Sequence, residues 1–154
     1  MPLAALGAVV ELEGPEGRRE VPLVDFHRLP GDTPEIETER RAGEIVTALR
    51  LPADAAGFAA HARYLKLRER TSYAFAVVST AAMLRIENGR IAQARIALGG
   101  VALKPWRAVE AETRLRGAEP GTAAFEQAAE AALAGARPSG DNAHKIELAR
   151  RLVV

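Results

Sequence analysis

The sequence of 154 residues contains no cysteine. Disulfide bonds, iron–sulfur ligation and thiolate catalysis are therefore excluded for this chain. Aromatic residues are also few, at 5% of the total, so the core must be built mainly from leucine, valine, isoleucine and alanine. A core of that kind suits closely packed helices and a sheet better than an aromatic-lined groove.

Neither sign of charge dominates, because 21 basic and 20 acidic residues give a formal net charge of +1. Nucleic-acid binding normally requires a basic face, which an interleaved charge pattern does not provide. No apolar stretch approaches the length that spans a bilayer, and the N-terminus lacks the basic segment and long apolar core of a signal peptide. We therefore expect a soluble protein whose partners include neither nucleic acid nor a membrane.

The first third of the chain predicts a hairpin, a long loop and a further strand. Residues 3–13 and 18–23 have extended patterns, and Gly14-Pro15-Glu16-Gly17 between them has the composition of a turn. A polar loop over residues 30–42 is longer than a simple connection needs to be, which favours a functional or disordered segment. Residues 44–51 then predict a strand.

Small and polar residues at 53–57 mark the best candidate for a domain boundary. Beyond it, residues 61–70 predict a strand. The apolar run 73–86 is followed by Asn88-Gly89 and a second apolar run, 91–98, which together predict a hairpin because both turn residues tolerate positive φ. The alanine-rich middle of the first run leaves a helix open as an alternative.

Three helices are predicted after Pro105. The first covers residues 106–115 and ends near Gly117, the second has Thr122 as its N-cap, and the third opens at residue 141 or 142. Strands followed by helices indicate an α+β fold, with an antiparallel sheet packed against a three-helix layer.

The polar residues form no evident catalytic or metal-binding constellation. His27, His61 and His144 lie on separate predicted elements, and none has a second ligand at metal spacing. Asp25 could pair with His27 only if the chain bends suitably, and no serine or threonine sits in a nucleophile elbow. The sequence therefore predicts neither catalytic residues nor a metal site.

Two features allow a second interpretation. Lys66, Arg68 and Arg70 alternate, so on one strand they would share a face, either as a solvated edge or as a cationic strip facing an anion such as a dinucleotide pyrophosphate. Gly99-Gly100 after a strand could place N–H groups near a phosphate, or could simply form a tight turn beneath the helices. From the residues alone, the solvated edge and the tight turn are favoured.

Several segments, in order, resemble the flavin subunits of molybdenum hydroxylases, the family of xanthine dehydrogenase, aldehyde oxidoreductase and CO dehydrogenase. Residues 63–76 resemble the segment Y-x-K-x-R-x-R-x-S-Y-x-F-A that opens the C-terminal domain of the aldehyde oxidoreductase type. Residues 43–46 with Leu51-Pro52 resemble a G-E-[IL]-[IL]…[LI]-P strand, and residues 96–107 resemble a strand, a glycine turn and a helix entry. The resemblance covers essentially the whole chain.

The resemblance implies a fold, a cofactor and contact residues. Residues 1–52 would be the end of the FAD-binding domain, and residues 60–154 a domain like the CO dehydrogenase flavoprotein C-terminal domain. Ile45 or Val46 and Lys66 would contact FAD, with Arg70 on a neighbouring loop. The glycine-rich FAD-binding loops of the family have no counterpart here, so we expect this chain alone to bind FAD weakly or not at all.

The resemblance also implies a function and partners. The intact subunit would pass electrons from iron–sulfur clusters to FAD and then to an external acceptor. Its partners would be a large subunit with the molybdenum cofactor and a small [2Fe–2S] subunit. A cytoplasmic location is expected, although export together with a partner subunit stays open. The alternative is a stand-alone α+β interaction module that has lost flavin binding.

Overall fold

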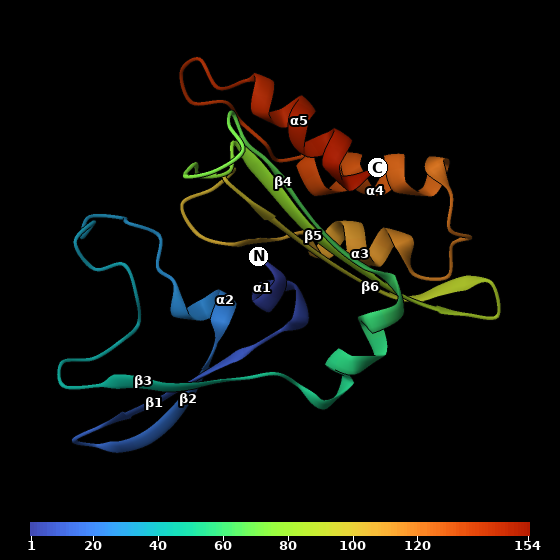
Figure 1. The fold of residues 1–154 in the computed structure, drawn as a ribbon. Helices are drawn as coiled ribbons and strands as arrows, with labels where there is room; N and C mark the ends of the chain where they lie inside the picture. Colours follow the sequence, from blue (N-terminus) through green and yellow to red (C-terminus); the bar gives the residue numbers. More distant parts are fainter.

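The computed structural model describes all 154 residues as two antiparallel sheets with helices (Figure 1). The first sheet has the order β2-β1-β3, with β1 at Val9–Gly14, β2 at Gly17–Pro22 and β3 at Ile45–Arg50. The second has the order β4-β5-β6-β7, with bounds Ala62–Leu67, Val78–Glu87, Arg90–Gly99 and Trp106–Arg107. The helices are α1 (Pro2–Leu6), α2 (Leu23–Phe26), α3 (Val109–Leu115), α4 (Thr122–Leu133), α5 (His144–Val153) and a 3-10 helix, η1 (Ala53–His61). None of them combines the length and apolarity that crossing a membrane requires.

Both predicted hairpins are confirmed. Gly14 pairs with Gly17 at the end of the β1–β2 ladder. In the second hairpin Asn88 and Gly89 have φ values of 51° and 73°, as a type I′ turn requires, and β5 pairs with β6 on either side of them. The apolar run before this turn is thus a strand, and the helical alternative is wrong.

The N-terminus differs from the prediction, because residues 2–6 form a helix instead of the start of a strand. Pro2 fits the first turn of a helix, where its missing N–H costs no hydrogen bond. Gly7 ends the helix in the left-handed conformation, with φ 72°, and its N–H donates to the Ala4 carbonyl. Ala4 and Ala5 are fully buried, so tertiary packing decides the conformation of this alanine-rich segment.

The last three helices exist, but each begins at a different residue than predicted. Trp106 and Arg107 form β7 beside β6, so α3 begins only at Val109. Thr122 is the first helical residue of α4 and not its cap, and α5 begins at His144.

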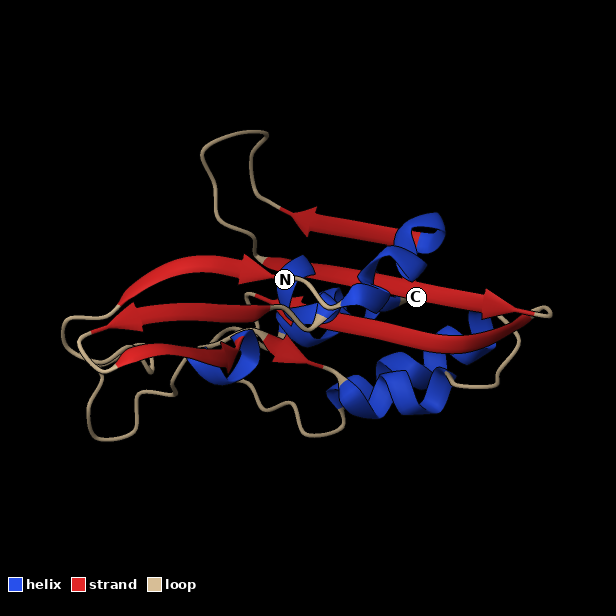
Figure 2. Cartoon of the chain, turned by 90° about the horizontal axis from the view of Figure 1, so that it is seen from below, coloured by secondary structure: helices blue, strands red, loops and turns tan.

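The second sheet is covered on both faces of its central strands. Helices α3, α4 and α5 pack on one face over a cluster that includes Ile91, Ile96 and Leu115. On the other face, α1 and Phe58 of η1 cover Ala81 and Ala97. Figures 1 and 2 show α1 lying between the two sheets, with the longer helices on the far side of β5 and β6. The α+β prediction, with an antiparallel sheet against a three-helix layer, is confirmed.

Polar contacts join the C-terminal part of the chain to the N-terminal helices α1 and α2. The buried Glu112 accepts the N–H of Ile96 at 2.8 Å and pairs with Arg107, which also donates to the Ala4 carbonyl at 3.2 Å. Lys104 donates to the Val24 carbonyl at 3.0 Å. Helix α1 precedes the first sheet in the sequence but packs on the second sheet. The division of the chain into domains at residues 1–52 and 60–154 therefore stays a prediction.

Candidate functional site

Strand β3 carries the first pair of predicted flavin residues on the outside of its sheet. All six of its residues are exposed, and β1 is its only neighbour. Ile45 is 64% exposed and Val46 is 46% exposed, although both are strongly apolar. A strand with this composition normally gains its stability from a covered face, so β3 presents an apolar surface that nothing within the chain covers.

A partly buried ion pair holds the chain as it enters β3. Arg19 of β2 donates to both carboxylate oxygens of Glu44, at 2.6 Å and 2.8 Å, and the backbone N–H of Arg41 donates to the same carboxylate at 2.6 Å. Gly14 allows this approach, because a Cβ there would lie 2.7 Å from Glu44 Cγ. We call Arg19, Arg41 and Glu44 the Glu44 clamp.

The Glu44 clamp keeps its carboxylate ionised. The hydrogen bond from the Arg19 guanidinium, followed by that from the Arg41 backbone, lowers the pKa of Glu44 from 4.5 to about 2 against the opposing effect of desolvation. The clamp therefore fixes the backbone immediately before Ile45 at any neutral pH. The sequence analysis did not predict the Glu44 clamp. Its available signal was a Gly-Glu pair directly before a strand, together with a glycine in the neighbouring hairpin.

Strand β4 carries the other predicted strand residue, Lys66. Lys66 lies opposite Ser79, and Tyr64 opposite Ala81, so both side chains lie on the α1 side of the second sheet. Arg63 lies opposite Ala82 and points to the helix side. Every residue of β4 is exposed, which leaves the strand uncovered on both faces.

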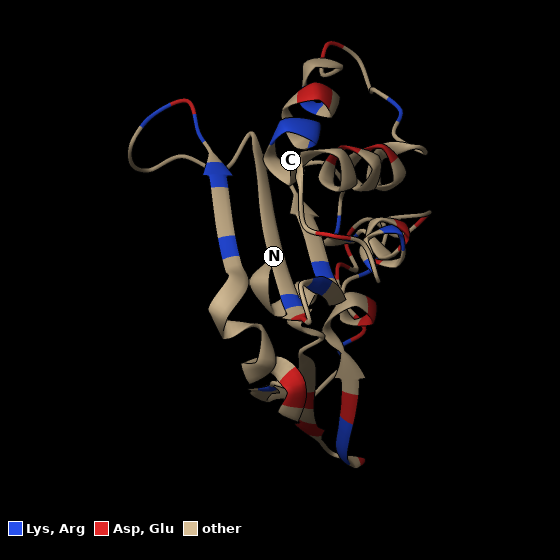
Figure 3. Cartoon of the chain, turned by 90° about the vertical axis from the view of Figure 1, so that its right-hand side faces the viewer, with Lys and Arg blue, Asp and Glu red and all other residues tan.

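The cationic strip is corrected by the structure. Strand β4 ends at Leu67, so Arg68 and Arg70 lie on the loop between β4 and β5 instead of continuing the strand. Figure 3 shows this loop projecting beyond β4 with a basic, an acidic and a second basic position. Side chains alternate between the two faces of a sheet only within a strand, and β4 ends at Leu67. Of the three cations, only Lys66 therefore has a side-chain direction that is set by the sheet.

The loop after β4 has its own fixed shape. Arg70 Nε donates to the Tyr73 carbonyl at 3.1 Å, and Tyr73 has the unusual φ of 50°. Tyr73 is 95% exposed and Phe75 is 98% exposed. The loop thus presents two aromatic side chains beside two guanidinium groups.

The predicted site residues come from both sheets and remain separate from one another. Ile45 and Val46 lie on β3, Lys66 lies on β4, and Arg70 lies on the following loop; no hydrogen bond or ion pair joins them. Apolar side chains suit a flavin ring, and a free ammonium suits its phosphates or a negative charge on the ring. The chemistry of each residue thus suits a flavin, and their use in one common site stays a prediction.

The glycine pair and the histidines add nothing to this site. A Cβ on Gly100, whose φ is 77°, would lie 2.7 Å from the Val77 carbonyl oxygen, so this glycine permits close backbone packing. That favours the tight-turn interpretation over phosphate binding. No group of three or more His, Asp or Glu side chains could hold a metal ion.

The chain matches two protein families along its length. Residues 1–54 match the FAD binding domain in molybdopterin dehydrogenase, and residues 63–154 match the CO dehydrogenase flavoprotein C-terminal domain. The second match covers more than half of the chain.

Similar proteins agree with these matches. The aldehyde oxidoreductase FAD-binding subunit PaoB of Escherichia coli (strain K12) is 43% identical over 148 residues, which are 95% of this chain and 42% of PaoB. The carbon monoxide dehydrogenase medium chain of Afipia carboxidovorans is 32% identical over 139 residues, or 90% of this chain and 46% of that one. A solved structure of carbon monoxide dehydrogenase from Hydrogenophaga pseudoflava superposes with a TM-score of 0.83 at 33% identity, covering 99% of this chain and 52% of that one.

The chain therefore spans about half the length of the relatives it matches. Two family matches in the expected order, relatives above 30% identity and a superposition over nearly the whole chain lead to one assignment. The chain belongs to the CO dehydrogenase flavoprotein C-terminal domain family, and it corresponds to the C-terminal portion of the FAD-binding subunits of molybdenum hydroxylases.

Proposed function

We propose that this chain forms one side of the FAD site in the electron-transfer subunit of a molybdenum hydroxylase of the xanthine dehydrogenase and aldehyde oxidoreductase type. Electrons would reach FAD from iron–sulfur clusters and leave to an external acceptor. The partners of the subunit would be a large subunit with the molybdenum cofactor and a small [2Fe–2S] subunit. When bound, FAD supplies the redox chemistry.

One observation carries the proposal: the strands with the predicted FAD contacts are also the strands left uncovered. β3 and β4 are outermost in their sheets and exposed over their full length, and they are rich in Ile, Val, Leu and Tyr. The relatives contain about as much chain again. We infer that this additional chain covers β3 and completes the site.

Each side chain then has a distinct role. Ile45 or Val46, which point to opposite faces of the strand, provides apolar contact for the isoalloxazine ring, while the Glu44 clamp keeps the backbone in place. Lys66 offers a free cation for a phosphate or for negative charge on the ring. Arg70 shapes the loop beside the site through its bonds to the Tyr73 carbonyl.

The test is a fluorescence titration with FAD. We expect no tight binding by this chain alone at micromolar FAD, because it lacks glycine-rich loops that could hold the pyrophosphate through backbone N–H groups. Mixing it with the N-terminal half of an intact family member should restore bound, yellow flavin. Stoichiometric binding by this chain alone would refute the inference that half of the site is missing. A folded but colourless mixture would favour the stand-alone interaction module.

A further inference from the structure

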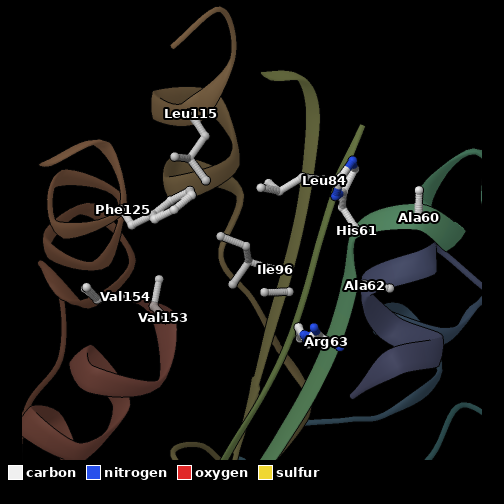
Figure 4. Close-up of a pocket in the computed structure, with 11 residues that line it drawn as sticks. Ala60, His61, Ala62, Arg63, Leu84, Ile96, Leu115, Phe125, Val153 and Val154 are labelled. Carbon is white, nitrogen blue, oxygen red and sulfur yellow. The ribbon is translucent and has the colours of Figure 1, made fainter. Parts of the chain in front are cut away.

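We propose a second ligand site on the helix side of β4, built for a small amphipathic carboxylate such as a medium-chain fatty acid. Its place is a cavity of about 250 Å³ between the second sheet and the helices α3, α4 and α5 (Figure 4). The site is independent of the proposed flavin function, since Lys66 points to the opposite face of the same strand.

The inner part of the cavity is apolar. Its walls are side chains of β5, β6 and the helices: Ala82, Leu84, Ile96, Leu115, Phe125 and Val153. Protein interiors are close-packed and rarely leave voids larger than a water molecule. Apolar cavities of about 150 Å³ already accommodate benzene, so this one has room for a short alkyl chain or a single aromatic ring.

The sheet side of the mouth is basic. His61 and Arg63 lie there, across the cavity from Phe125 and the chain end at Val154 (Figure 4). Arg63 lies opposite Ala82, so its side chain is on the same face of the sheet as the apolar wall. Both side chains are exposed, and neither joins any of the side-chain hydrogen bonds or ion pairs of the chain.

The arrangement matches one chemical class of ligand. The alkyl part of a carboxylic acid would fill the apolar interior, which excludes water from Leu84 and Phe125. Its carboxylate would then reach the Arg63 guanidinium, with which it can form two parallel hydrogen bonds, and His61 would provide a second donor. A neutral ligand of the same length would fill the apolar interior but would form no ion pair with the guanidinium.

Calorimetric titration of the full chain with sodium octanoate tests the proposal. We expect saturable binding with a Kd on the order of 1 mM, which is reasonable for about ten non-hydrogen atoms. Octanamide, which has the same chain without the charge, should bind at least about fivefold more weakly. Acetate, which has the charge without the chain, should not bind measurably.

Three variants and one control locate the site. Arg63→Gln should weaken octanoate by about fivefold and leave octanamide unchanged, because only the charged contact is lost. Ala82→Leu should abolish binding of both ligands by filling the cavity, and Val153→Phe fills it from the helix side if the first variant folds poorly. Arg68→Gln removes the same charge from the nearby loop and should leave octanoate binding unchanged.

Several outcomes would overturn the proposal. Equal affinity for octanoate and octanamide would mean that the basic mouth has no role. Unchanged binding in both cavity-filling variants would place the ligand elsewhere. Concentration-dependent dimerisation that either filling variant abolishes, with no octanoate binding, would show that a second copy occupies the cavity. None of these results depends on whether FAD binds.

Discussion

Replacing Lys66 with alanine separates a role in FAD binding from a role in folding. Lys66 is exposed on an outer strand, and its ammonium makes no hydrogen bond or ion pair within the chain. Exposed substitutions away from caps, networks and strained backbone usually change the free energy of unfolding by less than about 0.5 kcal/mol. We therefore expect Lys66→Ala to leave the denaturation midpoint almost unchanged.

The expected effect on the cofactor is larger. A hydrogen bond from an ammonium to a phosphate or to a negatively charged ring contributes about 1.5–3 kcal/mol. Because about 1.4 kcal/mol corresponds to a factor of ten in affinity, FAD should dissociate from the assembled subunit at least about tenfold more readily. The assay requires two quantities from one preparation: the FAD dissociation constant from flavin fluorescence and the midpoint of urea denaturation.

A matched control is available on the same strand. Arg63→Ala removes the same charge from β4, but its side chain lies on the helix side of the sheet. FAD affinity should hardly respond to this change, whereas a general electrostatic attraction would weaken equally in both variants. If Lys66→Ala lowers the midpoint while FAD affinity stays intact, then Lys66 is structural and the proposed contact is wrong.

Three further predictions concern the fold. Gly100→Ala should lower the free energy of unfolding by about 2–4 kcal/mol, because a Cβ would lie 2.7 Å from the Val77 carbonyl at a φ of 77°. The control is Gly89→Ala, where φ is 73° and the space around the glycine is open. It should lower the free energy of unfolding by only about 1 kcal/mol in the same urea titrations. The pKa of Glu44 in the folded chain is lowered from 4.5 to about 2, so its stabilising contribution is complete above about pH 4.5 and is lost as the pH falls towards 2. In wild type the urea midpoint should therefore fall over that pH window, and Glu44→Gln should make the fall shallower. An unchanged pH profile in the variant would contradict the Glu44 clamp. Hydrogen exchange should be slower in β5 and β6 than in β1–β3, which expose an uncovered edge; equal protection would remove the basis for two units of different stability.

Local chemistry accounts for the parts of the fold that the sequence predicts well. Asn88-Gly89 satisfies a type I′ turn by itself, so the β5–β6 hairpin needs no knowledge of the rest of the chain. The segment before Gly7 has weaker local signals, Pro2 at its start and Gly7 after its end, and its alanines fit an extended pattern as well. Burial of Ala4 and Ala5 against Phe58 and the second sheet then favours the helix.

In the candidate site, too, some features follow from the local sequence and others depend on residues far away in the chain. Exposed apolar positions on β3 follow from the strand prediction, whereas the Glu44 clamp depends on Arg19, which is 25 residues earlier in the chain. The cationic strip was predicted by extending an alternating pattern through Arg70, but the ladder with β5 ends at Leu67. A pattern of alternating charges shows which residues could share a face; only the pairing partner shows where the strand stops.

The two proposed sites meet on β4, and this has an energetic consequence. β4 is held by its ladder with β5 alone, and none of its six residues is buried. Local unfolding of β4 should therefore require less free energy than that of β5 or β6, whose faces are covered.

A ligand that binds only the folded strand lowers the population of the unfolded strand in proportion to its occupancy, whichever face it occupies. Octanoate bound beside Arg63, and FAD bound beside Lys66 in the assembled subunit, should thus both slow exchange of the β4 amides. The Arg63 and Lys66 variants should each remove only one of the two effects, and loss of both in either variant would show that the faces of β4 do not act as separate sites.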